Sequence, residues 1–343
     1  MADPILKTYG TQAARHFELA AANLALRQAA VGTSKGNVSP WPGCSDPDFH
    51  GTLAAIWLWS RHQALTGLPR FATARALAWK FVEQSWSQFI PEALGPDASD
   101  EAAFDCAMVL RAALADRLLG EAAANPSVNA LAASAARVLA AYLAELTDLS
   151  GRDFQDPGFL AWNLIEYGRV GEERGLMAAG RGFVERAFGM KAPPGFASEV
   201  ESVGGLFDFS STTATRVLAI LAAEGNTPFV GAWLRERVVP AIPPGFVPRD
   251  LDENCWNACV AVLMGRAYAI STDPRFLEAY KAICGELARR DVNLDAAIAR
   301  DERSADVEVD TLATFYYALA IDSLIRAESV AHEGAGRNVH ARR

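Results

Sequence analysis

The chain has 343 residues, a formal net charge of −9 and 51% hydrophobic residues, which is enough apolar surface for a large buried core. An acidic chain without a basic cluster ahead of its C-terminal tail is not expected to bind nucleic acid, because phosphate contacts require clustered Lys and Arg. Its five cysteines are irregularly spaced, so a disulfide framework is not expected either. No apolar run approaches membrane-spanning length and the N-terminus lacks signal-peptide features, so we expect a cytoplasmic protein with no membrane span.

A helical hairpin near the C-terminus repeats a hairpin near the N-terminus at a constant offset. The segment 46–77 aligns with 251–282. The matched positions are Arg61 with Arg266, Pro69 with Pro274, Arg70 with Arg275 and Phe71 with Phe276. Each copy begins with acidic or polar capping residues, continues with apolar residues at near-helical spacing, and reaches a proline that suits the first turn of a second helix.

The remaining sequence divides into further units of this kind. In chain order the expected helices are 11–30; 48–65 with 70–88; 99–119 with 126–149; 159–170 with 172–188; 208–225 with 229–239; 252–270 with 274–290; and 306–327. Ala and Leu dominate over Val and Ile, which favours helix over sheet. Repeats of roughly 45–55 residues that cannot bury an apolar face alone are typical of helical arrays.

The first and last helices have no hairpin partner of their own. If they pack together, six hairpins close into a ring of twelve helices, forming one domain over residues 1–330 with a polar tail at 331–343. An open solenoid is the alternative, but the unpaired helix at each end favours closure.

This repeat pattern resembles the α/α toroid, or six-hairpin barrel, over essentially the whole chain. The fold is shared by class II terpenoid cyclases, protein prenyltransferase β subunits, alkenol dehydratases, lanthipeptide cyclases, and many glycosidases, lyases and sugar epimerases. The resemblance implies an all-α (α/α)6 toroid with inner and outer rings, whose chemistry takes place in the central cavity at one rim. It identifies no single family, since fold does not fix function.

The resemblance also implies that the starts of the inner helices converge on that rim. Most polar residues there are explained as ordinary helix caps. Four side chains lie about one turn beyond their caps and are the better catalytic candidates. They are His50, Asp105, Cys255 and Asp310.

The segment Glu308–Val309–Asp310–Thr311 resembles the Asp-x-Asp-Asp or Asp-x-Asp-Thr motif of class II terpenoid cyclases. The resemblance implies that Asp310 is the general acid, with Glu308 as a neighbour that raises its pKa. The chain departs from the motif at Glu308, where the family has Asp. His50, Asp105 and Cys255 are then candidate relays or bases.

A zinc site is the alternative use of the same helices. Prenyltransferase β subunits bind zinc through an Asp-x-Cys pair and a His on the next inner helix, which would place Glu253, Cys255 and Asp310 as ligands, with His50 and Cys106 as further candidates. Zinc prefers Cys and His, so this set would be unusual. Cys255 and Cys259 are equally explained as small buried apolar residues. We therefore expect no cofactor, with zinc as the alternative.

Aromatic side chains are also concentrated near the inner helix starts. The predicted substrate-binding residues are Trp41, Phe49, Trp57, Phe104, Trp162, Phe209, Trp256 and Phe315. Such a lining stabilises a carbocation or stacks on a sugar ring, although core packing explains most aromatic residues equally well.

These observations predict an enzyme that performs acid–base chemistry on a small-molecule substrate. The leading hypothesis is a cyclase, isomerase or dehydratase of a hydrophobic, isoprenoid-like compound. The first alternative is a carbohydrate-active toroid such as a glycoside hydrolase, lyase or epimerase, and the second is a non-catalytic helical scaffold. The oligomeric state is left open, with a homo-oligomer as one outcome.

Overall fold

The computed structural model describes residues 15, 18–94, 100–120, 125–147, 157–187, 211–225, 228–239, 254–289, 311, 314–316 and 318–323. The named helices are α2 (Phe49–Thr66), α3 (Ala72–Phe89), α4 (Asp100–Leu118), α5 (Pro126–Glu145), α6 (Pro157–Val170), α7 (Arg174–Ala187), α10 (Ser211–Glu224), α11 (Pro228–Trp233), the π-helical turn η2 (Leu234–Val238), α12 (Asn254–Ser271) and α13 (Pro274–Arg289). Helical residues also occur at 18–26 and between 311 and 323.

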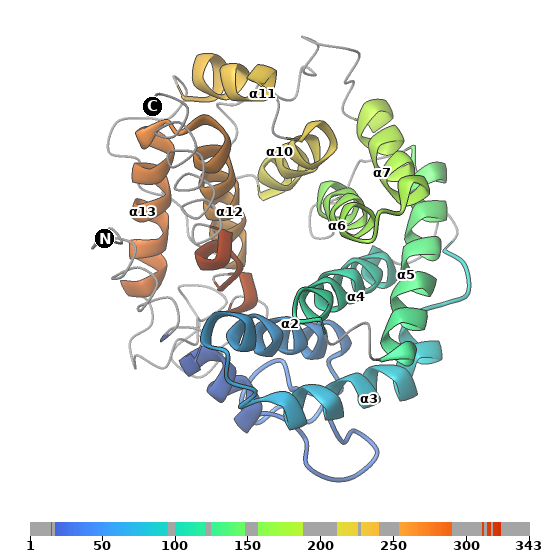
Figure 1. The fold of residues 1–343 in the computed structure, drawn as a ribbon. Coiled ribbons are helices and arrows are strands. Elements are labelled where there is room, and N and C mark those ends of the chain that lie inside the picture. The colour runs from blue at the N-terminus through green and yellow to red at the C-terminus, as the bar shows by residue number, and fades with distance from the viewer. Residues whose placement is uncertain are drawn as a thin grey trace, which may run out of the picture.

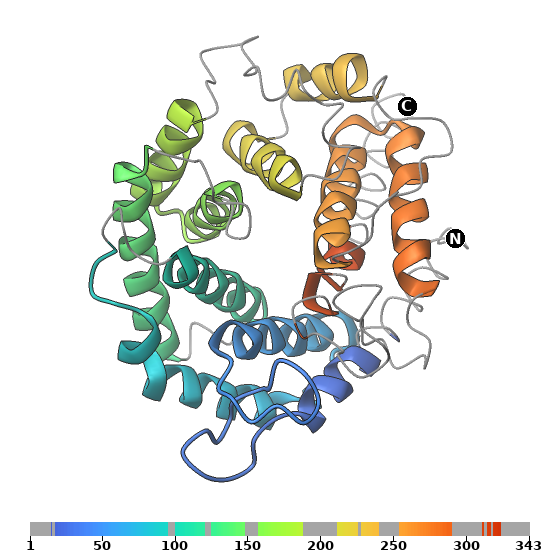
Figure 2. The same cartoon turned by 180° about the vertical axis from the view of Figure 1, so that it is seen from behind.

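The helices form a ring with two layers (Figures 1 and 2). The inner layer contains α2, α4, α6, α10 and α12, and the outer layer contains α3, α5, α7, α11 and α13. Successive inner helices pack against one another, and α2, α4, α6 and α12 each pack against the outer helix that follows, whereas α11 packs against α12. The predicted all-α toroid with inner and outer rings is confirmed.

Helices α2 and α4 run parallel, as the side-chain pairs between them show. His50 on α2 contacts Asp105 on α4, and further along the same two helices Ser60 contacts Asp116. Residues further along α2 therefore contact residues further along α4. The starts of α2 and α4 consequently lie at one rim, which we call the N-terminal rim.

The two layers differ in how they bury apolar surface. Nearly all of α2 from Phe49 to His62 is buried, whereas α3 buries a stripe that includes Ala78, Trp79 and Val82. An inner helix is covered on all sides and is apolar all round, while an outer helix keeps one face in solvent. This difference explains why the inner helix is the more apolar one in the hairpins α2–α3, α6–α7 and α12–α13, whereas in α4–α5 the outer helix is the more apolar.

The repeat predicted between α2 and α12 holds at their C-terminal ends. Gly67 ends α2 with a backbone N–H bonded to the Gln63 carbonyl, and Thr272 ends α12 with the same bond to Tyr268, each at 2.8 Å. Both residues are left-handed, with φ of 71° and 57° respectively. Glycine adopts this conformation without strain, whereas threonine does not.

Arginine side chains join neighbouring helices at their C-terminal ends. Arg186 on α7 donates to the carbonyl of Leu143 on α5 at 2.9 Å, and Arg235 in η2 donates to the carbonyl of Ser271 at 3.3 Å. Arg169 on α6 donates likewise to a carbonyl in the last turn of α10. These carbonyls have no partner within their own helix, so a guanidinium both satisfies them and suits the negative end of the helix.

Two features differ from the sequence-based expectations. The return helix predicted at 229–239 is broken, because α11 passes into the π-helical turn η2. In addition, α5 is long and apolar enough to cross a membrane by length and composition alone, with 44% of its apolar window buried. This differs from the expectation that no apolar run reaches that length. Packing of α5 against α4 and α7 accounts for its apolar residues.

The first and last helical segments each contact α2. The indole N–H of Trp59 donates to the carbonyl of Ala21 at 3.0 Å, and Nε of Arg61 donates to Oδ1 of Asp322 at 3.0 Å. The single domain over 1–330 remains a prediction, and the tail at 331–343 lies outside the described residues.

Candidate active site

His50 lies in the first turn of α2 with each ring nitrogen facing a carboxylate. Nε2 is 3.3 Å from Oδ1 of Asp48, and Nδ1 is 3.4 Å from Oδ1 of Asp105 on α4. The imidazole remains 24% exposed, whereas the Asp105 side chain is only 2% exposed. An accessible imidazolium between two buried carboxylates is placed to donate a proton to a bound molecule.

Asp48 has two functions at the start of α2. Its Oδ1 accepts a hydrogen bond of 2.8 Å from the backbone N–H of Gly51, so Asp48 is the N-cap of the helix. A Cβ atom on Gly51 would lie 2.1 Å from Oδ2 of Asp48, so only glycine leaves room for the carboxylate. The same carboxylate faces His50, so capping and a role beside the imidazole coincide in one residue.

The electrostatics of this cluster keep His50 protonated. Burial alone would lower the pKa of His50, but the carboxylates of Asp105, Asp48 and Glu101 outweigh it and raise that pKa to about 9. Burial raises the pKa of Asp105, while His50 opposes the shift. Both pKa shifts therefore favour the protonated form of the group concerned, the imidazolium of His50 and the carboxylic acid of Asp105.

Aromatic rings line the inner helices next to His50. Phe104 packs edge-on against the imidazole at 5.8 Å and stacks on Phe159 of α6 at 5.2 Å. Phe159 in turn contacts Trp162 at 5.9 Å and Tyr316 at 6.0 Å. The contacts continue from Tyr316 to Phe315 and from Phe315 to Trp57. Four of the predicted substrate-binding residues, Trp57, Phe104, Trp162 and Phe315, therefore belong to one aromatic cluster, and all four are buried.

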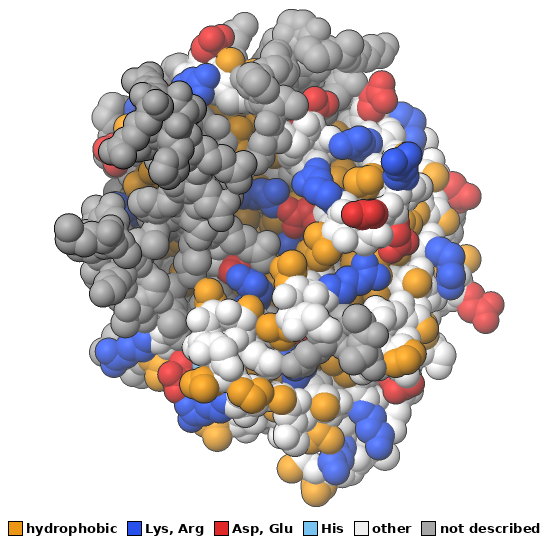
Figure 3. Space-filling model, viewed as in Figure 1, with side chains coloured by type: hydrophobic (Ala, Val, Ile, Leu, Met, Phe, Trp, Pro, Cys, Tyr) orange, Lys and Arg blue, Asp and Glu red, His pale blue; other side chains and the backbone are white. Residues whose placement is uncertain are grey.

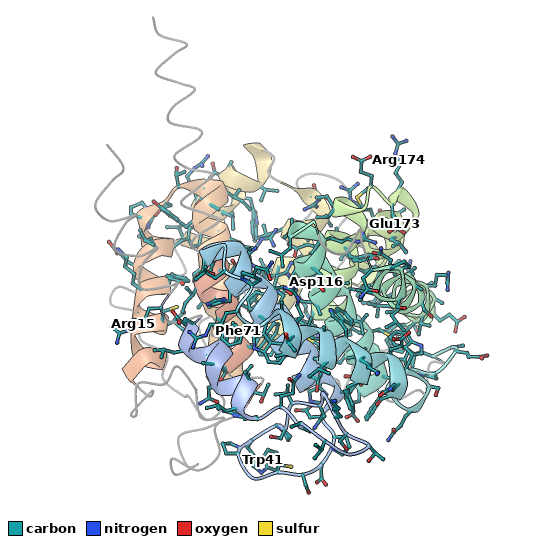
Figure 4. The ribbon with its side chains drawn as sticks, turned by 60° about the horizontal axis from the view of Figure 1, so that its bottom comes forward. Arg15, Trp41, Phe71, Asp116, Glu173 and Arg174 are labelled. Atoms are coloured by element: carbon teal, nitrogen blue, oxygen red, sulfur yellow. The ribbon has the colours of Figure 1, made fainter. Side chains whose placement is uncertain are left out.

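Phe49 and Trp41 lie outside this cluster. Phe49 stacks on Phe89 of α3 at 4.8 Å, which is packing between the two layers. Trp41 is 42% exposed on the loop before α2. Figure 4 shows it at the opposite end of the molecule from Glu173 and Arg174, which form the turn between α6 and α7. The ring that packs against the imidazole is instead that of Phe104.

A second charged cluster lies deeper along the inner helices. Glu166 on α6 accepts hydrogen bonds from Arg111 on α4, at 2.9 Å, and from Arg266 on α12. The Arg111 guanidinium also lies 4.2 Å from the ring centre of Trp162. Basic and acidic side chains lie side by side near the middle of the face shown in Figure 3. We call Arg111, Glu166 and Arg266 the central ionic cluster.

The central ionic cluster keeps its carboxylate ionised. Burial opposes ionisation of Glu166, but Arg266 and Arg111 hold its pKa well below the usual range. A carboxyl group held ionised in this way cannot act as a general acid near neutral pH. The cluster also spans the ring, because α10 lies between α6 and α12 and packs against both.

Sequence reasoning missed the central ionic cluster because it searched the starts of the inner helices. A signal was present in the sequence: single charged residues interrupt apolar stretches in MVLRAAL, NLIEYG and LMGRAYA. A lone charge on a helix that is buried all round needs a partner. Arg61 matches Arg266 in the repeat and likewise pairs with a buried carboxylate, that of Asp322.

Several predicted site residues fall outside the described part of the chain. Asp310, Glu308 and Phe209 are among them, and of Cys255 and Trp256 the structure describes only the backbone, within α12. Their predicted roles therefore remain predictions. Of the five predicted catalytic residues, the structure describes the side chains of His50 and Asp105, and it brings them together.

The zinc alternative involves mostly the same residues. Glu253 and Asp310 lie outside the described residues, as does the Cys255 side chain. Among the side chains that the structure describes, no group of three or more His, Cys, Asp and Glu is arranged to hold a metal ion. Cys106 is buried next to Asp105, and burial raises the pKa of its thiol, which disfavours the thiolate that zinc requires.

Comparison with known proteins supports the fold. No known protein family and no curated protein matches the sequence. In structure, the chain is similar to cellobiose 2-epimerase from Spirochaeta thermophila DSM 6192, with a TM-score of 0.62 and 13% identity over 95% of this chain and 98% of that chain. At this identity the similarity shows the shared toroid fold.

The leading hypothesis of an isoprenoid cyclase or dehydratase is wrong. The toroid that the chain matches over nearly its whole length is carbohydrate-active, which supports the first alternative instead. The error arose from a four-residue match around Asp310, and such matches occur by chance in a chain with 41 Asp and Glu residues.

Proposed function

We propose that this protein is a sugar isomerase of the epimerase type, which inverts the carbon next to the carbonyl group of a reducing sugar. The observation that carries the proposal is the accessible His50 imidazole held between Asp48 and Asp105 at the N-terminal rim. The similarity to a cellobiose 2-epimerase supports the substrate class.

Epimerisation next to a carbonyl group requires an acid and a base at one carbon. A base removes the proton, whose acidity the adjacent carbonyl increases, and an acid returns a proton to the opposite face of the sugar. His50 is suited to the role of the acid, because Asp105 and Asp48 raise its pKa and keep it protonated, while the base acts from the opposite face of the sugar. We assign His50 as the group that exchanges protons with the substrate and Asp105 as its partner.

The contacts of His50 leave room for a substrate to compete for the imidazole. Its two carboxylate contacts, at 3.3 and 3.4 Å, are longer than a charge-assisted hydrogen bond of about 2.8 Å. A sugar hydroxyl or carbonyl oxygen can therefore replace one of them at little cost. The neighbouring Phe104 edge offers an apolar wall of the kind on which sugar rings pack.

The charges favour proton transfer over glycoside hydrolysis. Hydrolysis needs two carboxyl groups about 5–9.5 Å apart on either side of the bond, one of them protonated. Among the described residues, Asp48 and Asp105 both face the same imidazole, and Glu166 is held ionised by two arginines. None of these three carboxylates is arranged to flank a glycosidic bond.

The direct test is exchange of the carbon 2 proton of a reducing sugar in deuterium oxide, followed by NMR. Cellobiose and glucose are the substrates, and methyl β-glucoside, which has no carbonyl form, is the negative control. We expect deuterium at carbon 2 and signals of the carbon 2 epimer from at least one reducing sugar. Release of glucose from cellobiose without exchange would instead identify a hydrolase. The absence of both proton exchange and glucose release would overturn the proposal.

Two histidine variants assign the chemistry within this assay. His50→Gln removes the proton-exchanging group, and we expect a rate roughly 10²–10⁴-fold lower. His62→Gln is the matched control, because His62 is on the same helix and packs edge-on against Phe71, away from the carboxylate pair. Equal loss of activity in both variants would assign His50 to structure instead of catalysis.

A further inference from the structure

The loop before α2 contains polar residues that are buried. Asn37, Val38 and Ser39 are all less than one-tenth exposed, although Trp41 on the same loop is exposed. Loops normally run over the surface, because buried backbone needs hydrogen-bond partners. The buried part of this loop therefore has a structural reason.

That reason is a compact hydrogen-bond network around the Asn37 side chain. Its Oδ1 accepts a hydrogen bond of 2.8 Å from the backbone N–H of Asp48 and lies 3.2 Å from the hydroxyl of Thr52. The Thr52 hydroxyl also lies 2.7 Å from the Asp48 carbonyl and accepts from the backbone N–H of Val38 at 2.9 Å. The side chain of Asn37 thereby ties the loop to the residues on both sides of His50.

The same loop is fixed at a second point. The backbone N–H of Thr311 donates to the carbonyl of Pro40 at 3.0 Å, and its hydroxyl donates within 3.0 Å to the carbonyl of Ser39. Thr311 begins the described part of the last helical segment. The loop thus connects the start of α2 with Thr311, which lies 272 residues from its partner Ser39 in sequence.

We propose that Asn37 is a positioning residue of the acid–base centre, which holds the Asp48 carboxylate beside Nε2 of His50. Asn37 bonds the backbone of Asp48, the Gly51 N–H bonds its side chain, and the missing Cβ of Gly51 leaves room for the carboxylate. Two hydrogen bonds and the space left by Gly51 therefore determine where this carboxylate lies.

The charged groups that face His50 come from two elements. Asp48 approaches from the loop, while Asp105 and Glu101 approach from α4. Of these three residues, Asn37 hydrogen-bonds Asp48. A change at Asn37 should therefore remove the contribution of Asp48 to the imidazole and leave that of α4 in place. A role of Asn37 in catalysis rests on the proposed function, whereas its role in positioning the Asp48 carboxylate does not.

The experiment is a titration of the histidine ring signals by NMR in the full-length protein, which has five His. Assignment of His50 comes from His50→Gln. In Asn37→Ala we expect the pKa of His50 to fall from about 9 by at least about one unit, because Asp48 is released. Asn37→Asp retains both acceptor contacts and should keep the pKa at or above the wild-type value.

A second pair of variants covers the case in which Asn37→Ala does not fold. Thr52→Val removes the hydroxyl at nearly constant volume and should lower the pKa of His50, whereas Thr52→Ser retains the hydroxyl and should not. If Asn37→Ala and Thr52→Val lower the melting temperature but leave the pKa unchanged, the network is only structural and the inference is overturned. A wild-type pKa near 6.5 would overturn it as well.

The sugar assay separates this inference from the proposed function. If both hold, Asn37→Ala should lower kcat by about twofold at pH 8 and by about ninefold at pH 10, and change KM little. These factors are the loss of protonated His50 when its pKa falls from about 9 by about one unit. If the chain exchanges no sugar proton but the pKa falls as expected, the positioning role stands and the proposed function fails.

Discussion

The two charged clusters of the ring use the same inner helices in opposite ways. At the N-terminal rim, His50 faces Asp48 and Asp105 at 3.3 and 3.4 Å and is partly exposed. Deeper in the ring, Glu166 is largely buried. Its carboxylate is bound by two arginines, Arg266 and, at 2.9 Å, Arg111.

The difference teaches which charges are available for chemistry. Loosely held groups with a raised pKa can exchange a proton with a substrate, whereas Glu166 is fully compensated and stays ionised. Charge on an inner helix is therefore not a sufficient sign of catalysis, because the central ionic cluster joins α4, α6 and α12 across the ring.

Removal of the Glu166 charge should give the largest loss of stability. Glu166→Gln leaves Arg111 and Arg266 close together without their carboxylate, and breaking a buried ion pair costs about 3–5 kcal/mol. Denaturant unfolding would measure this loss. The matched control is Glu173→Gln, whose carboxylate is 43% exposed and 3.8 Å from Arg117, and whose loss should cost under about 1 kcal/mol. Similar losses in the two variants would contradict the structural role of the cluster.

The pH dependence of stability should come from the rim. The pKa of His50 is raised from 6.5 to about 9, so its stabilising charge is fully present below pH 6.5 and is lost as pH rises through 9. We expect the free energy of unfolding to fall between these values in the wild type and to fall less in His50→Gln. His62→Gln should retain the wild-type slope, because burial lowers the pKa of His62 and keeps it neutral in this range.

Displacement of Asp48 should have a smaller effect on stability and a visible effect on His50. In Gly51→Ala the new methyl group would meet the Asp48 carboxylate, so we expect the cap to be lost at about 1 kcal/mol and the pKa of His50 to fall. Gly175→Ala is the control, since a Cβ there meets no atom within 4 Å. A Gly51→Ala variant with unchanged stability and unchanged His50 titration would contradict the described geometry.

The smallest expected effect is a gain in stability, at a residue that belongs to neither charged cluster. Thr272→Gly relieves a left-handed threonine and should stabilise the protein by up to about 1 kcal/mol, measured as a higher melting temperature. The equivalent Gly67→Thr change in α2 should destabilise it, because the same backbone conformation would then hold a side chain. A loss of stability in Thr272→Gly would show that the two hairpin ends are not equivalent.

Local features of the chain were sufficient to predict most of the helices. The hairpin register between α2 and α12, the proline starts of α5 and α13, and the turn at Thr66–Gly67 all follow from nearby residues. They were predictable because capping, proline and helical periodicity act over a few residues. His50 and Asp105 were selected in the same way, as polar residues beyond the caps.

Only the tertiary structure decided which of these groups meet. Arg266 and Glu166 are 100 residues apart, and Asn37 joins the network of Asp48 only because the loop folds back onto α2. Such pairings depend on how the ring brings distant helices together, which no local pattern encodes. The repeat pattern therefore indicated an all-α toroid through its resemblance to that fold, whereas only the folded ring placed His50 between two carboxylates and Glu166 between two arginines.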